Sequence, residues 1–100
     1  MRCLFKAQLE AGAGNHAIRE GLLPKLIANT IETLKPEASY FYAEDGKRTA
    51  CFYFDLKDPS KIPVIVEPWF MTANAAVSII PAMNHSDLEK GIKEAAKSFE

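Results

Sequence analysis

Two side chains in this sequence have the chemistry to form a reactive thiolate. Cys51 and Lys6 lie in two alternating stretches, and the strand pairing predicted below places them opposite each other. A nearby ammonium group lowers the pKa of a thiol, so Cys51 is a candidate nucleophile. The alternative is a small, buried strand residue, which is a common role for a free cysteine.

The two histidines are the next candidates for chemistry. His85 lies in a loop just before a predicted helix, and an ordinary histidine pKa of ~6.5 suits a general acid or base. A solvated loop residue is the alternative for His85. His16 lies in the first turn of a predicted helix, where the helix dipole disfavours its cation. Because no third type of metal ligand clusters with either histidine, we predict no metal site.

Trp69 and Phe70 lie on the apolar stripe of a predicted helix, and both are expected to point toward the layer formed by Phe5 and Phe52. An indole ring there either forms the wall of a pocket for a flat ligand or packs in the core. A glycine pair at Gly12 and Gly14 lacks the third glycine of a dinucleotide-binding motif. We therefore predict no cofactor.

The stretch from Ala38 to Leu56 predicts a β-hairpin. Asp45-Gly46 separates two alternating runs, and both central residues of a type I′ turn need a positive φ, which these two tolerate well. One face of the hairpin then carries Tyr40, Tyr42, Cys51, Tyr53 and Asp55. The opposite face carries Phe41, Ala50, Phe52, Phe54 and Leu56. The phenylalanine face predicts a core under helices, and the tyrosine face needs a cover that tolerates hydroxyl groups.

The N-terminal part predicts a strand and two helices. Residues 2–9 alternate as a strand, and residues 10–14 predict a loop. Asn15 is the predicted N-cap of a helical stretch that breaks near Gly21 and ends before Pro36. Pro24 fits the first turn of the second helix, where its missing N–H costs little.

The C-terminal part predicts a helix, a strand and a last helix. Ser60 is the predicted cap of a helix that contains Pro68 and ends at Asn74. Residues 75–82 predict a strand. Ser86-Asp-Leu-Glu89 predicts a capping box for the last helix. Its apolar residues are expected to face inward: Leu88, Ile92, Ala95, Ala96 and Phe99.

The element order β-α-β-β-α-β-α predicts an α+β, ferredoxin-like fold with an additional C-terminal helix. Right-handed crossovers give an antiparallel sheet of strand order 4-1-3-2, with Arg2 opposite Asp55 and Phe5 opposite Phe52. The face without helices would show Lys6, Gln8, Tyr40, Tyr42, Cys51, Tyr53, Ser78 and Ile80. This patch is larger than a soluble monomer usually exposes, so we predict a homodimer packed sheet to sheet.

Composition limits the class of protein. One hundred residues predict one domain, residues 1–100. A net charge of −1 argues against nucleic acid as a partner. The sequence has neither an apolar run of membrane-spanning length nor a signal-peptide pattern, so we expect a cytoplasmic protein without membrane association.

Four segments carry a resemblance to a known group. They are the hairpin with its Asp-Gly turn, DLKDPSKIP, EPWF, and NAAVSIIPAMNHSDLEKGI, and the resemblance covers nearly the whole chain. The chain resembles the dimeric α+β barrel superfamily, which includes muconolactone isomerase-like proteins, antibiotic-biosynthesis monooxygenases and haem-degrading monooxygenases. It looks most similar to a small bacterial family of unassigned function. The motifs are structural, so they imply the fold and leave the function open.

Two functions remain open. The first is a dimeric small-molecule-binding protein, with a cofactor-independent enzyme of monooxygenase or isomerase type on a small apolar or aromatic substrate as its alternative. The second is a non-catalytic binding or regulatory module in which the barrel is only a dimerisation scaffold. The pocket would lie either between sheet and helices or inside the dimer barrel. The candidate ligand-binding residues are Trp69, Phe70, His85, Lys6, Tyr40, Tyr42, Cys51, Tyr53 and Asp55; no catalytic residue is assigned.

Overall fold

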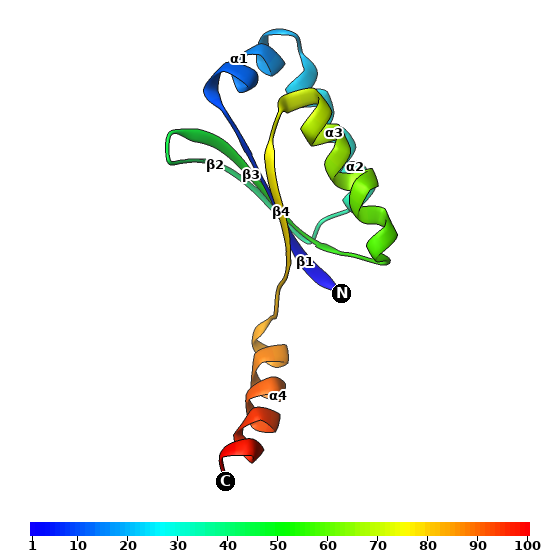
Figure 1. Cartoon of the computed structure of the whole chain (residues 1–100). Coiled ribbons are helices and arrows are strands. Elements are labelled where there is room, and N and C mark those ends of the chain that lie inside the picture. The colour runs from blue at the N-terminus through cyan, green and yellow to red at the C-terminus, as the bar shows by residue number, and fades with distance from the viewer.

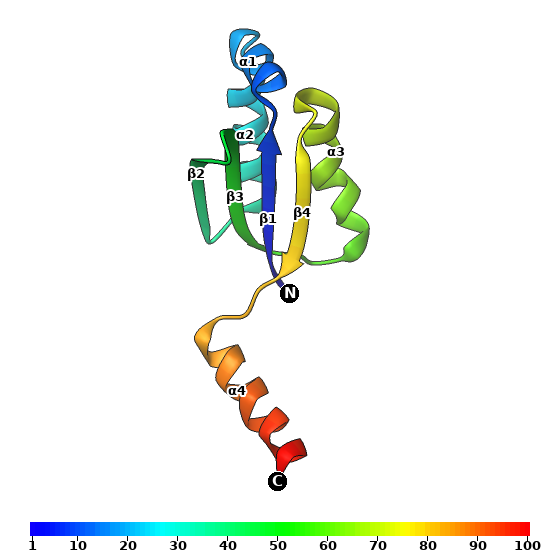
Figure 2. The same cartoon turned by 60° about the vertical axis from the view of Figure 1, so that its left-hand side comes forward.

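The computed structural model describes residues 1–100 as a four-stranded antiparallel sheet with α2 and α3 on one face and the other face open (Figures 1 and 2). In chain order the elements are β1 (Arg2–Leu9), α1 (Ala11–Arg19), α2 (Leu22–Leu34), β2 (Ala38–Glu44), β3 (Lys47–Asp55), a 3₁₀ turn (Pro59–Lys61), α3 (Ile62–Ala73), β4 (Ala76–Pro81), α4 (His85–Ala96) and a 3₁₀ turn (Lys97–Phe99). The strand order is β2-β3-β1-β4, which is the predicted order read from the other edge. The α+β class and the ferredoxin-like sheet order are therefore confirmed.

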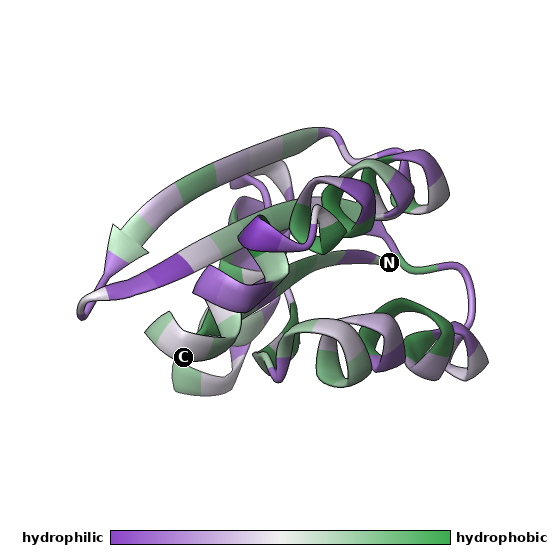
Figure 3. Cartoon of the chain, turned by 90° about the horizontal axis from the view of Figure 1, so that it is seen from above, coloured by the Kyte–Doolittle hydropathy of each residue, from purple (hydrophilic) through white to green (hydrophobic).

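The predicted strand register is confirmed. In the β1–β3 ladder Lys6 lies opposite Cys51, as predicted. The β2–β3 hairpin turns at Asp45 and Gly46, which have φ angles of 55° and 73°. Because side chains alternate along each strand, this register places the tyrosine side chains on the open face and the phenylalanine side chains toward the helices. Hydrophobic and hydrophilic residues accordingly alternate along the strands (Figure 3).

The break in the N-terminal helical stretch is confirmed, but its start is not where the sequence predicted. Gly21 has a φ of 71° and separates α1 from α2, and Lys35 ends α2 before the proline. The predicted loop at residues 10–14 is wrong, because α1 already begins at Ala11. Gly14 is buried against Arg48, so a tertiary contact there outweighs the poor helix propensity of glycine.

The ends of α3 follow the sequence with one correction. Asn74 ends the helix in the left-handed region, as predicted. The predicted cap Ser60 is wrong, because α3 begins after Lys61 without a side-chain cap. Asp58 instead caps the preceding 3₁₀ turn, where its carboxylate accepts a hydrogen bond of 2.8 Å from the backbone N–H of Ser60. β4 is shorter by one residue at each end than the predicted strand.

Aromatic rings form the centre of the core between the sheet and α3. Trp69 is 1% exposed, and its ring centroid lies 5.7 Å from that of Phe5 and 6.1 Å from that of Phe52. The inward direction predicted for Trp69 is thus confirmed. The same prediction for Phe70 is wrong, since Phe70 is 41% exposed. Consecutive helical residues point about 100° apart, so only one of the two can face the sheet.

One hydrogen bond ties α3 to α2 inside this core. The indole N–H of Trp69 donates to the Thr30 hydroxyl at 2.9 Å, and that hydroxyl donates to the carbonyl of Leu26 at 2.7 Å. We expect Thr30→Val to lower the free energy of unfolding by ~1–3 kcal/mol, because the buried indole N–H loses its acceptor. Urea denaturation measures the change. Thr33→Val, the same substitution at an exposed position of α2, is the control and should have little effect.

α4 contradicts the prediction of an inward-facing last helix. It projects away from the sheet and the other helices (Figures 1 and 2), and the molecule is 58 Å long but only 28 Å and 19 Å across. Leu88 and Ile92 of α4 are exposed, and so is Phe99 of the following 3₁₀ turn. The apolar stripe was correctly identified, but α2 and α3 already occupy the helical face of the sheet.

The capping box of α4 also lies two residues earlier than predicted. Asn84 accepts a hydrogen bond of 2.8 Å from the backbone N–H of Asp87, whose carboxylate accepts one of 3.1 Å from the Asn84 N–H. Asp87 also accepts a hydrogen bond of 3.0 Å from Arg2. The start of α4 is thereby connected to β1.

Candidate functional site

A small cavity lies between the β2–β3 hairpin and the helices, and we call it the hairpin cavity. Its volume is about 220 Å³. Its apolar walls are Leu9, Leu23, Ile27, Phe41, Ala50 and Trp69, and its polar lining residues are Tyr42, Arg48 and Thr49. Phe41 is 51% exposed at the outer strand of the sheet, whereas Trp69 is buried at the back. The cavity therefore runs from the surface to the aromatic core.

Arg48 is the cation of the hairpin cavity. Its side chain is half-buried under α1, where one guanidinium N–H₂ donates to the Asn15 side-chain oxygen at 2.9 Å. Asn15 is a neutral partner, and Arg48 takes part in no ion pair. Sequence reasoning missed this residue. Its position in the alternation, on the same face as Ala50 and Phe52, was the available signal.

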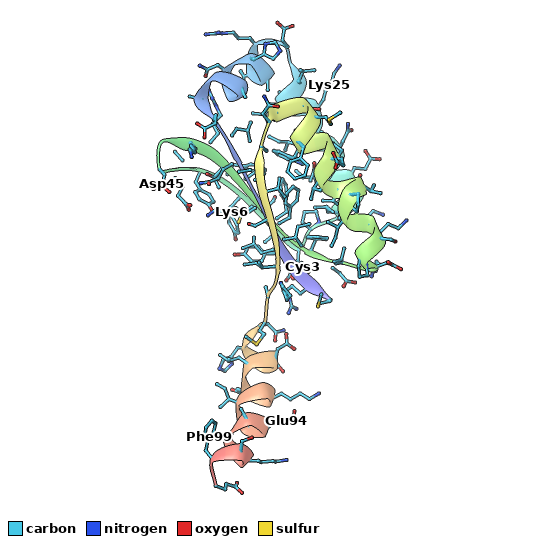
Figure 4. All side chains as sticks on the ribbon, in the orientation of Figure 1. Cys3, Lys6, Lys25, Asp45, Glu94 and Phe99 are labelled. Atoms are coloured by element: carbon cyan, nitrogen blue, oxygen red, sulfur yellow. The ribbon has the colours of Figure 1, made fainter.

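A second group of polar side chains lies on the open face of the sheet. Lys6 donates to Glu44 at 2.7 Å, and Gln8 donates to Glu44 and to Thr49, each at 3.3 Å. Figure 4 shows Lys6 on the side of the sheet away from α2 and α3. The hydrogen bond to Glu44 raises the pKa of Lys6. Glu44 was also missed, although it follows Tyr40 and Tyr42 in the same alternation.

Tyr42 and Cys51 lie beside this ion pair. Desolvation and, next, the neighbouring Cys51 raise the pKa of the Tyr42 phenol. Cys51 is a buried free cysteine, and the ammonium of Lys6 donates to Glu44. The predicted juxtaposition of Cys51 and Lys6 is therefore present in the register, but the carboxylate is the hydrogen-bond partner of the ammonium.

The remaining tyrosines lie on the same open face. Tyr40 is 61% exposed on β2, and Tyr53 is half-buried on β3 opposite Leu4. Ile80 of β4 lies on the other side of Leu4 and is 51% exposed. The open face thus combines an apolar centre with hydroxyl groups and the Lys6–Glu44 pair.

Asp55 lies at the far end of β3, apart from the polar group around Lys6. Its carboxylate accepts hydrogen bonds from Lys57 at 2.5 Å and from the amino group of Met1 at 2.6 Å. These hydrogen bonds, that from Lys57 first, lower the pKa of Asp55 to about 2. Asp55 is exposed, and its negative charge is balanced by Lys57 and the amino group of Met1. It therefore acts as an ion-pair residue at the end of β3.

Two other predicted site residues lie away from both groups. His85 begins α4 with its side chain 82% exposed, and its Nε2 lies 3.3 Å from a carboxylate oxygen of Glu89. Phe70 is on the outer side of α3. The structure therefore brings together Lys6, Tyr42 and Cys51 on the open face, and it places Trp69 at the hairpin cavity.

Two wider depressions also occur on the surface, with volumes of about 430 and 560 Å³. The first is lined mainly by charged side chains that pair with one another, such as Arg2 and Glu37 at 2.7 Å. The second lies at the end of α2 and includes Lys35, Lys57 and Lys61. Neither depression reaches the Trp69 core, so the hairpin cavity is the better candidate for an apolar ligand.

None of the helices has the length and apolar character required to cross a membrane. The structure contains no cluster of three or more histidine, cysteine or acidic side chains arranged to hold a metal ion. The chain matches no protein-family model, no curated protein and no solved structure.

Proposed function

We propose that this protein is a homodimeric small-molecule-binding protein of the dimeric α+β barrel type, with its ligand in the hairpin cavity. The observation that carries the proposal is an apolar cavity of about 220 Å³ that ends at Trp69. An apolar cavity of ~150 Å³ is large enough to hold benzene in another protein. Ligand sites are typically apolar clefts with a few polar groups, and this cavity has that character.

Binding is favoured over catalysis by the ionisable groups at the cavity. The lining includes Arg48 and Tyr42, and the Tyr42 phenol itself lies on the open face beside Cys51. The guanidinium stays protonated, and the raised pKa of Tyr42 keeps its phenol protonated at neutral pH. Neither group is thus a general base at neutral pH. The Arg48 guanidinium can donate hydrogen bonds to a bound molecule.

The second copy is proposed to cover the open face of the sheet. This face exposes Tyr40, Tyr42 and Ile80, and Ile80 lies next to Leu4. An apolar patch of this kind is typical of an interaction surface. The Lys6–Glu44 pair and the tyrosine hydroxyl groups would lie inside the interface, so we expect a partly polar interior with bound water. The exposed apolar stripe of α4 would be available to the same partner.

Ligand binding can be tested through Trp69, the single tryptophan of the chain. Titration of the full-length protein with toluene should shift the indole N–H signal in an NMR spectrum until it saturates. Ile27→Phe fills part of the cavity and should weaken toluene binding by about tenfold, because the ring occupies the space of the ligand. Ile31→Phe makes the same change one helical turn further along α2, outside the cavity, and should leave binding unchanged. Equal toluene affinity in the two variants would refute the proposed site.

A further inference from the structure

We infer that the hairpin cavity selects a small carboxylate with one apolar ring, and that Arg48 binds the carboxylate group. This inference rests on the proposed function and names the chemical class of its ligand. The walls of the cavity are apolar, and Arg48 is the residue in the lining that carries a full charge at neutral pH. A ligand that fills the cavity and forms an ion pair with Arg48 must therefore be apolar over most of its surface and negatively charged at one end.

The state of the Arg48 guanidinium supports an anionic ligand. A guanidinium group has five N–H donors, and the structure uses one Arg48 nitrogen for a side-chain hydrogen bond, to Asn15 at 2.9 Å. The neighbouring Lys47, in contrast, has a carboxylate partner, Glu10, at 3.2 Å. The positive charge of this half-buried guanidinium is not balanced by a negative side chain, because its partner is neutral. A carboxylate would supply the negative charge and accept from the remaining donors in bidentate geometry.

The surroundings hold the guanidinium in a defined position. Gly14 of α1 lies so close that a Cβ atom there would be 2.6 Å from Nη1 of Arg48. The adjacent Asn15 fixes the other terminal nitrogen. α1 therefore packs over the guanidinium at Gly14 and orients it through the side-chain amide of Asn15. A preorganised guanidinium loses less conformational entropy when it binds an anion.

The volume limits the size of the ligand. Since ~150 Å³ is enough for a benzene ring, a cavity of about 220 Å³ admits one ring with a short chain. The phenol of Tyr42 lies beside Cys51 and Lys6 on the open face of the sheet, so it does not face a ligand in the cavity. The carboxylate of Glu44 forms its ion pair with Lys6 on the open face of the sheet. A suitable probe is 3-phenylpropanoate, and 3-phenylpropanamide is its neutral counterpart of nearly the same shape.

The test compares the two probes by calorimetry and by the Trp69 indole signal, with the full-length protein at neutral pH and low salt. We expect 3-phenylpropanoate to bind about tenfold or more tightly than the amide, because only the carboxylate offers the guanidinium a negative charge and two acceptor oxygens in bidentate geometry. Arg48→Gln should remove this preference by weakening carboxylate binding more than amide binding. Lys47→Gln, which removes the same charge from the adjacent residue, should retain the preference.

Gly14→Ala provides a second variant if Arg48→Gln fails to fold. The added methyl group displaces the flexible end of Arg48 and should reduce the carboxylate preference without removing a charge. If the amide binds the unchanged protein as tightly as the carboxylate, this inference is wrong and the proposed function stands. The inference is also wrong if Arg48→Gln keeps the preference. If neither probe nor toluene shifts the indole signal, both the inference and the proposed function are wrong.

Discussion

A chain carrying Leu4→Glu is expected to be monomeric at concentrations where the unchanged chain is a dimer. Leu4 lies on β1, inside the sheet, between Tyr53 and Ile80 on the open face. In a monomer the new carboxylate reaches water, so the fold should persist. In a sheet-to-sheet dimer it would be buried without a partner, and the resulting cost of several kcal/mol should weaken association by about 100-fold or more.

Light scattering and sedimentation measure the mass of each variant, and circular dichroism checks that the fold is retained. Val64→Glu is the matched control, because Val64 is an exposed apolar residue on α3 rather than on the open face. This control should remain dimeric. A single-chain mass for the unchanged protein at micromolar concentration would contradict the predicted dimer. Equal dimer stability of the Leu4 and Val64 variants would instead exclude the open face as the interface.

Trp69→Ala is expected to give the largest loss of stability of any single truncation in this chain. Trp69 is 1% exposed, contacts the rings of Phe5 and Phe52, and donates to Thr30. Truncation of a buried large aromatic residue costs ~3–5 kcal/mol, because the packing contacts are lost and a cavity remains. Since small domains have a total stability of ~5–15 kcal/mol, the variant should be close to its unfolding threshold at room temperature.

The neighbouring residue supplies the control for this prediction. Phe70 is 41% exposed, so Phe70→Ala should cost ~1 kcal/mol or less. Urea denaturation of both variants gives the difference in the free energy of unfolding. Losses of similar size would mean that the two aromatic residues share the core, as the apolar periodicity alone had predicted.

The elements of this fold follow from local properties of the sequence. A positive φ at Asp45 and Gly46 determines the hairpin turn, and the turn determines which residues pair and which face each side chain occupies. Gly21 separates the first two helices for a similar local reason. The sheet order then follows from right-handed connections, and sequence reasoning predicted it correctly.

The sequence predicts less well which residues of a helix point toward the core, because the apolar stripe is wider than the buried face. Both Trp69 and Phe70 fit the pattern of α3, and only contact with the sheet decides that Trp69 is the buried one. The apolar stripe of α4 identifies a face that needs a partner, but it does not identify the partner. In the structure that face is exposed, since α2 and α3 occupy the helical side of the sheet.

The candidate site was decided by tertiary structure. The sequence determined that Trp69 lies on the apolar stripe of α3 and that Lys6 lies opposite Cys51, because these depend on periodicity and register. The contacts of Arg48 with α1 and of Lys6 with Glu44 join residues more than thirty positions apart. Local conformational preferences do not predict contacts between residues that are so far apart in the sequence. The hairpin cavity exists because α2 and the hairpin leave a space between them, which becomes visible only when both are placed against β1.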